Sequence, residues 1–126
     1  MPELPVDAIF EKIPFKRMNT APNEPPAGSF KIGVNDGTAL ELICLEPNRN
    51  YKPHHHKDSD ARIYIITGSG TVAMDGQIVP YWAGDTFSFP RNMRHGFNTL
   101  ERTLIFSIQE PALESPTTGE FDFHYD

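Results

Sequence analysis

Short runs of β-branched and aromatic residues, separated by tight-turn pairs, recur along most of this chain. Asp36-Gly37 separates the run at 29–34 from the run at 38–46, and Asp75-Gly76 stands between two further runs. Each Asp-Gly pair predicts a β-hairpin, because glycine accepts the positive φ that the tight turn needs. At least two hairpins are therefore expected.

The remaining runs follow the same pattern, and nothing after residue 15 shows helical periodicity over a useful length. Further strands are expected at 62–67, 85–89, 103–108 and 121–125. Trp82 is expected in the core, and residues 1–15 could form either a short helix or an arm. The pattern as a whole predicts an all-β antiparallel sandwich or barrel.

Length and composition limit the classes of function. A chain of 126 residues is expected to form one domain, with residues 1–28 as an N-terminal arm and proline-rich loop and 29–126 as the barrel. The net charge of −6, without a basic patch, argues against nucleic acid and membrane partners. Cys44 is the only cysteine, and no signal-peptide core or membrane-length apolar run is present, so a cytoplasmic protein is expected.

Three consecutive histidines precede one of the predicted strands. Because side chains alternate along an extended chain, His54 and His56 should project to one side and His55 to the other. Two imidazoles do not hold a metal ion firmly, so a third ligand is expected. His95 is the candidate, since His124 lies close to the C-terminus in a segment expected to be peripheral.

The positions of these histidines resemble the two motifs of the cupin family. The spacing of the first motif is met by Asn48, His54, His56, Ala61 and Gly68, and that of the second by Gly84, Pro90, Asn92, His95 and Thr99. Asn48 and Asn92 replace family glycines and tolerate the left-handed turn geometry, so these changes are mild. Ala61 replaces the family glutamate, which is a ligand in many members.

The resemblance implies a single-domain cupin jelly-roll β-barrel with one divalent transition metal held by His54, His56 and His95. Iron leads, with zinc, manganese, nickel and copper as alternatives. A small residue at position 61 would leave room beside the ion for water or substrate. Asp60 is a candidate additional ligand, although its side chain should face away from Ala61 unless a bulge turns it inward.

Strand parity extends the prediction to the wall of a pocket. Ile63 and Ile65 share the face of Ala61, and Phe97 shares the face of His95, so these side chains should look into the same cavity. The wall of the expected pocket is therefore partly apolar.

Three functions follow from the resemblance, and no catalytic residue is assigned. The leading one is an Fe(II)-dependent dioxygenase acting on a small organic molecule. The second is a non-oxidative metal-dependent isomerase or lyase, which needs a general base that the sequence lacks unless Tyr64 or Asp60 turns inward. The third is a non-catalytic barrel that binds a small ligand such as a sugar.

Two further expectations concern assembly and pH. The resemblance implies a homodimer, because small cupins often pair. Imidazole must be neutral to bind a metal, so metal affinity is expected to fall below about pH 6.5, the pKa of an unperturbed histidine.

Overall fold

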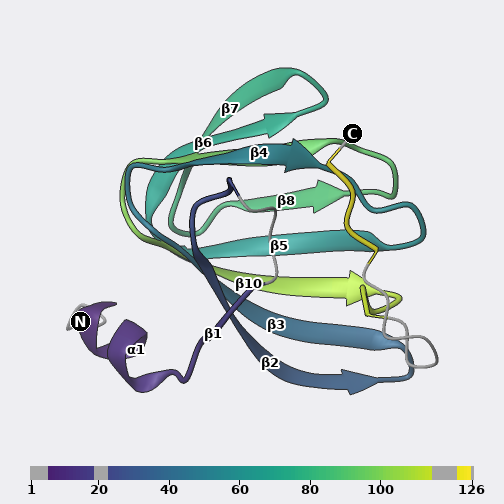
Figure 1. Cartoon of the computed structure of the whole chain (residues 1–126), viewed down its shortest axis with the longest axis horizontal. Coiled ribbons are helices and arrows are strands. Elements are labelled where there is room, and N and C mark those ends of the chain that lie inside the picture. The colour runs from purple at the N-terminus through teal and green to yellow at the C-terminus, as the bar shows by residue number, and fades with distance from the viewer. Residues whose placement is uncertain (1–5, 19–22, 115–121, 126) are drawn as a thin grey trace.

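Two antiparallel sheets make up most of the molecule (Figure 1). The computed structural model describes residues 6–18, 23–114 and 122–125. The larger sheet contains, in spatial order, β1 (Lys16–Arg17), β2 (Ala27–Asn35), β3 (Thr38–Leu45), β10 (Thr103–Glu110), β5 (Asp60–Thr67) and β8 (Thr86–Phe89). The smaller sheet contains β4 (Asn50–His54), β9 (His95–Thr99), β6 (Ser69–Met74) and β7 (Gln77–Trp82). The predicted all-β class is confirmed.

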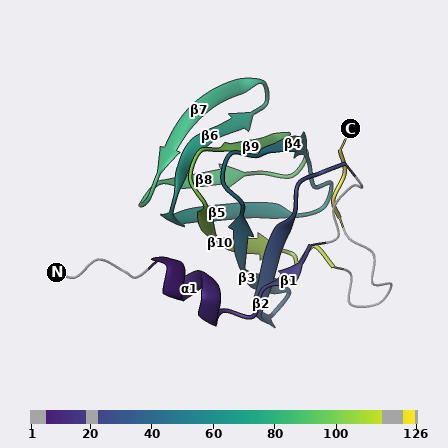
Figure 2. The ribbon, with the colours of Figure 1, turned by 60° about the vertical axis from the view of Figure 1, so that its left-hand side comes forward.

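The N-terminal part contains one short helix, α1 (Val6–Lys12), which lies outside the space between the sheets (Figures 1 and 2). The guanidinium of Arg102 lies over the ring of Phe10, 4.9 Å from its centre. Among the described residues, no helix is both long and apolar enough to cross a membrane. Strand β1 lies within the predicted arm, and β2 begins at Ala27, two residues before the predicted boundary. The division into arm and barrel stays a prediction.

Both predicted hairpins are confirmed. Strands β2 and β3 pair up to Asn35 opposite Thr38, and β6 and β7 pair up to Met74 opposite Gln77. The four turn residues all have positive φ: Asp36 51°, Gly37 79°, Asp75 47° and Gly76 85°. Two central residues with positive φ are what a two-residue turn requires if its twist is to match that of the strands.

Strand β5 alternates between the core and solvent as its sequence predicts. Its buried side chains belong to the core between the sheets, whose buried members are Ala27, Leu45, Tyr51, Ala61, Ile63, Ile65, Val72, Tyr81, Phe89, Phe97 and Ile105. Two expectations were wrong. Trp82 is 61% exposed, because Tyr81 takes the inward position on β7. The run at 121–125 forms no strand among its described residues; His124 makes an isolated bridge to His55.

The asparagines that replace family glycines adopt the expected backbone. Asn48 has a φ of 56° and Asn92 a φ of 71°, both in the left-handed region that asparagine tolerates. Thr99 holds the turn at Asn48: its Oγ1 donates to the carbonyl of Glu46 at 2.6 Å and accepts from the amide of Arg49 at 3.0 Å. The turn that precedes the histidines is therefore held from β9.

We expect Gly68→Ala to lower the free energy of unfolding by about 1–3 kcal/mol, from backbone strain alone. Gly68 has a φ of 113°, and an added Cβ would lie 2.6 Å from the Cα of Thr103 and 2.7 Å from the carbonyl oxygen of Arg102. Two of the three nearest atoms belong to the backbone and the third is Oγ1 of Thr103 at 2.5 Å, so a change of side-chain rotamer alone would not relieve the contact. Urea denaturation measures the effect, with Gly33→Ala as the control because its Cβ would meet nothing within 4 Å. Equal losses in both variants would contradict this explanation.

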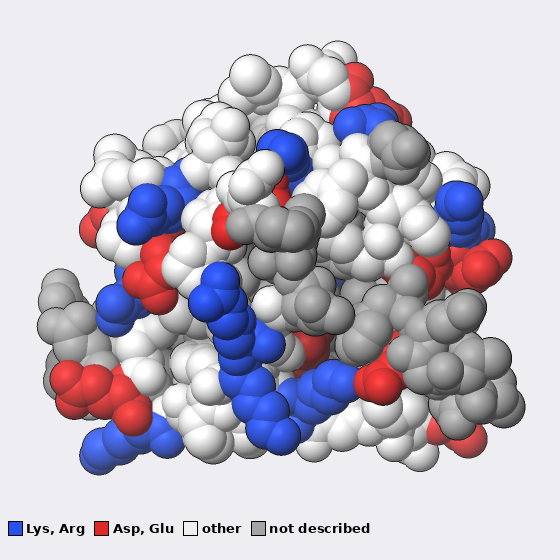
Figure 3. Space-filling view, viewed as in Figure 1, with Lys and Arg blue, Asp and Glu red and all other residues white. Residues whose placement is uncertain are grey.

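The charged side chains are distributed without a single dominant sign on the face that Figure 3 shows. Lys and Arg side chains lie beside Asp and Glu side chains over the described part of that face. Among the described residues, one exposed ion pair joins Lys31 Nζ to Glu114 Oε2 at 2.6 Å. Exposed pairs of this kind contribute little to stability.

Candidate metal centre

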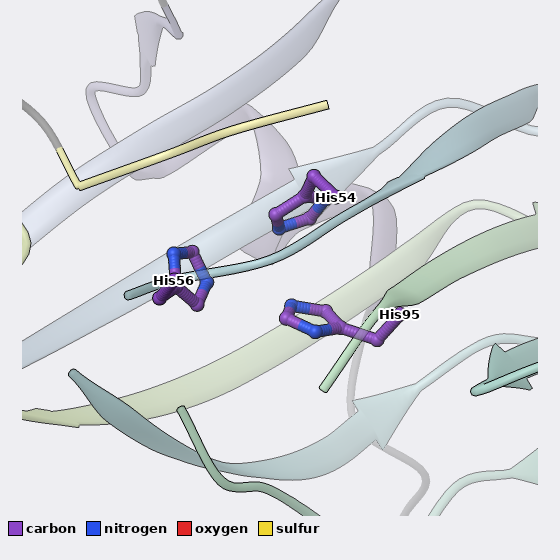
Figure 4. A group of neighbouring side chains, drawn as sticks. All are labelled: His54, His56 and His95. Carbon is purple, nitrogen blue, oxygen red and sulfur yellow. The ribbon is translucent and has the colours of Figure 1, made fainter. Parts of the chain in front are cut away.

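The structure brings His54, His56 and His95 together at one end of the smaller sheet. His54 ends β4 and is the cross-strand partner of His95, which begins β9, while His56 follows two residues after His54. One nitrogen from each ring lies within 4.8 Å of the others. Figure 4 shows the three rings arranged around a common space. The alternation predicted for the histidine run is thus present, with His55 outside the group.

The hydrogen bonds of two rings determine which nitrogen is available. Nδ1 of His56 lies 2.5 Å from the carbonyl oxygen of Asp122, and Nδ1 of His95 lies 3.0 Å from that of Met93. A carbonyl only accepts, so in both rings Nδ1 carries the proton and donates. The lone pair is then on Nε2, which is the arrangement that backbone carbonyls impose on metal-binding histidines.

All three imidazoles are held in the neutral form. Burial, followed by the neighbouring His95 and His56, lowers the pKa of His54 to about 2. Burial, followed by His56, lowers the pKa of His95 to about 3. Burial also lowers the pKa of His56, against an opposing hydrogen bond to the backbone of Asp122. Neutral imidazoles are the form that binds a metal, and three of them suit iron, zinc, nickel or copper.

Two aromatic rings pack face to face on the histidines. Phe89, which is 1% exposed, stacks on His95 with ring centres 4.1 Å apart and an angle of 5°. Phe123 stacks on His54 at 3.9 Å and 17°. These contacts restrict ring rotation, so the group is ordered before any ion binds.

The residues at 122–125 close one side of the histidine group. Backbone hydrogen bonds join His124 to His55 in both directions, at 2.7 and 3.0 Å. The carboxylate of Asp122 accepts from the amides of Lys57 and Asp58, each at 2.7 Å. The segment therefore both orients His56, through the Asp122 carbonyl, and carries Phe123 onto His54.

A cavity of about 90 Å³ adjoins the three histidines. Its apolar lining comes from both sheets and the C-terminal segment and includes Ile43, Leu45, Ala61, Ile63, Phe89, Phe97, Ile105 and Phe123. Of the four pocket residues that parity predicts, Ala61, Ile63 and Phe97 line this cavity. Ile65 does not; it is 2% exposed and lies in the core.

Asp60, the candidate additional ligand, is not part of the histidine group. The start of β5 is regular, so Asp60 points to the exposed face, where its carboxylate binds Arg91. The hydrogen bonds from Arg91 Nε and Nη2 are 3.2 and 3.1 Å long. Ala61 points inward as expected, and its cross-strand partner on β10 is Gln109.

Polar residues that the sequence analysis did not single out also line the cavity: Glu24, Glu41, Lys52, Ser107, Gln109 and Tyr125. Strand parity did not single out three of them, because the opposite faces of β3 and β10 are more apolar and carry Leu40, Leu42, Leu104, Phe106 and Ile108. Glu41 shares strand parity with Ile43 and Leu45, and Ser107 and Gln109 share parity with Ile105. Buried polar residues are hydrogen-bonded, so their roles are found from their contacts in the structure.

A two-sheet antiparallel barrel with convergent imidazoles beside a cavity defines the class of this protein. The sequence model of the cupin domain matches residues 41–107, which is more than half of the chain. The chain belongs to the cupin family.

Curated relatives and solved structures agree with this assignment. CurC, a polyketide synthase protein of Streptomyces cyaneus, is 27% identical over 94 residues, covering 72% of this chain and 60% of that protein. An acireductone dioxygenase of Exiguobacterium sibiricum is 28% identical over 92 residues, covering 64% and 51%. The chain thus spans about half to three fifths of the length of these relatives. An RmlC-like cupin from Shewanella frigidimarina has the same fold, with a TM-score of 0.67, 21% identity and coverage of 80% and 87%.

Proposed function

We propose that this protein is a metal-dependent enzyme that acts on a small organic molecule, with a dioxygenase reaction at Fe(II) as the leading activity. His54, His56 and His95 would hold the ion. The observation that carries the proposal is the convergence of one nitrogen from each of these imidazoles within 4.8 Å. Bound there, Fe(II) would supply a redox centre with coordination positions that the protein leaves open.

The side chains around the histidines suit an organic ligand. Phe89, Phe97 and Ile63 form an apolar wall that excludes water and favours burial of carbon atoms. Ala61 leaves space where a longer side chain would fill part of the cavity. The acireductone dioxygenase among the relatives supports the oxidative reading, although this chain spans only about half of it.

One observation favours the non-oxidative alternative, an isomerase or lyase. Such an enzyme needs a general base, and neither of the residues considered for that role is inside the barrel. Tyr64 is 37% exposed, and Asp60 binds Arg91 at the surface. The buried carboxylate of Glu41, by contrast, lines the cavity and could accept a proton from a bound ligand.

The deciding experiment measures metal content and oxygen uptake. Untagged protein is purified anaerobically without a nickel column and analysed by inductively coupled plasma mass spectrometry. It is then mixed with a panel of small enediols, catechols and 2-hydroxy acids in an oxygen electrode. We expect near-stoichiometric iron and substrate-dependent oxygen uptake.

The other outcomes separate the alternatives. Zinc, manganese or nickel with turnover in the absence of oxygen would favour the isomerase or lyase. Protein without metal would contradict the catalytic proposal and leave a non-catalytic binding barrel. The homodimer is a separate proposal, and a monomer in size-exclusion chromatography with light scattering would contradict it.

A further inference from the structure

A polar cluster lies on the cavity wall that the larger sheet provides. Ser107 on β10 is the cross-strand partner of Glu41 on β3, and Gln109 lies two residues further along β10. All three line the cavity that adjoins the histidines, and they are 8% (Glu41), 5% (Gln109) and 2% (Ser107) exposed. The cavity therefore has a polar site besides the histidine group.

Hydrogen bonds hold the Glu41 carboxylate in one orientation. Nε2 of Gln109 donates to Glu41 Oε1 at 2.7 Å and to Oγ of Ser107 at 3.2 Å. The hydroxyl of Ser29 donates to Glu41 Oε2. A carboxylate offers about four acceptor sites, so these two donors leave it able to accept from a ligand. Because the side chain is already ordered, a ligand would not have to immobilise it.

Glu41 is separate from the histidine group. Among the described residues, the three histidines have potential ligand atoms that all lie within 4.8 Å of one another. Glu41 is not part of this group. Gln109, which binds Glu41, lies opposite Ala61, where the side chain ends at Cβ. Glu41 and the three histidines thus line the same cavity as separate groups.

The position of Glu41 is costly for a purely structural residue. A buried carboxylate beside Ile43, Leu45 and Ile105 loses hydration, and the hydrogen bonds that it accepts from Ser29 and Gln109 come from neutral groups. An apolar residue at the same strand position would pack without that cost. The cost is offset if the carboxylate binds a ligand.

We propose that Glu41, oriented by Gln109 and Ser29, binds a small ligand by accepting a hydrogen bond from its hydroxyl or amine. The histidine group holds the other end of the same ligand. This inference rests on the proposed function for the second end of the ligand. It adds a substrate class: short molecules with an apolar middle, an oxygen group for the metal and a hydrogen-bond donor at the far end. A carboxylate at the far end is repelled.

The size of the cavity narrows this class. Its volume is about 90 Å³, whereas an apolar cavity that holds benzene has a volume of about 150 Å³. Phe89 and Phe97 border it, so the middle of the ligand contacts carbon rather than polar atoms. A ligand with only a few carbons between its two polar ends satisfies both restrictions.

The test compares probes that differ only at one end. Zinc-loaded protein is titrated calorimetrically with 3-hydroxypropanoate, 4-hydroxybutanoate and 5-hydroxypentanoate, and with their methyl counterparts butanoate, pentanoate and hexanoate. The series covers three chain lengths, so the measurement itself finds the ligand length that reaches from the histidine group to Glu41. We expect one hydroxy acid to bind about tenfold more tightly than its methyl counterpart, as one hydrogen bond to a charged group implies.

Two variants test the role of the carboxylate. Glu41→Leu should abolish the hydroxyl preference. Glu41→Gln, which keeps the shape and an accepting oxygen, should retain part of it and bind succinate more tightly than the parent, because the repelling charge is gone. Glu24→Gln is the matched control: Glu24 is also buried and lines the cavity, but its Oε2 accepts from the amide of Lys52.

The outcomes distinguish this inference from the proposed function, because the zinc content of every sample is measured. Normal zinc with no hydroxyl preference in the parent would overturn the role of Glu41 alone, as would a preference that survives in Glu41→Leu. Loss of the preference in Glu24→Gln but not in Glu41→Leu would assign it to the other carboxylate. A parent that binds no zinc would overturn both proposals.

Discussion

His54→Ala and His95→Ala should each lower the affinity for a divalent metal ion by about a hundredfold or more. Each variant removes one of three proposed ligands, and changes at residues that merely support a ligand already cost about 10–100-fold. Two imidazoles would remain, with water in the place of the third. Competition with a chromophoric chelator measures the dissociation constants for zinc and for Fe(II) under anaerobic conditions.

The histidine run contains its own control. His55 lies between two members of the group, yet its ring faces His124, with ring centres 5.4 Å apart. His55→Ala should therefore keep metal affinity within a few-fold of the parent. Asp60→Asn should do the same, because Asp60 pairs with Arg91 at the surface. Equal losses in His55→Ala and His54→Ala would contradict the proposed ligand set.

The metal-free protein should become unstable in mild acid. The pKa of His54 is lowered to about 2 and that of His95 to about 3, and the pKa of His56 is also lowered, in each case first by burial. In the unfolded chain these histidines titrate near 6.5. Below that pH the unfolded state binds more protons than the folded state, so stability falls as pH decreases, and it continues to fall until the folded pKa values are reached.

The expected effect is large. Each such histidine contributes about 1.4 kcal/mol per pH unit, so three contribute up to about 4 kcal/mol per unit, against a typical total stability of about 5–15 kcal/mol. Urea denaturation of metal-free protein between neutral and mildly acidic pH measures the slope. His54→Gln combined with His95→Gln should flatten it, and a double variant with the slope of the parent would contradict this account.

These pKa shifts also change an expectation drawn from the sequence. An unperturbed histidine would begin to lose its metal near pH 6.5. In the folded barrel, burial and the neighbouring imidazoles disfavour protonation. Proton competition for the metal should therefore begin well below pH 6.5 as long as the protein stays folded.

Features that depend on a few neighbouring residues were predictable from the sequence. The Asp-Gly hairpins, the left-handed turns at Asn48 and Asn92, and the two faces of β5 all formed as expected. Turn geometry depends on local φ and ψ, and side-chain alternation follows from strand geometry alone. Side-chain alternation also explains why Asp60 and Ala61 point to opposite faces of β5 and why His54 and His56 point in the same direction.

Features that depend on strand neighbours were decided by the tertiary structure. β10 lies between β3 and β5, and this order brings Gln109 beside both Glu41 and the position of Ala61. The packing of residues 122–125 against His54 and His56 likewise joins segments far apart in the chain. Periodicity states which face a residue occupies but not which strand lies next to it, because pairing depends on the free energy of the whole barrel. The histidine group was thus predictable from the sequence, whereas the hydrogen bond between Gln109 and Glu41 on the cavity wall required the structure.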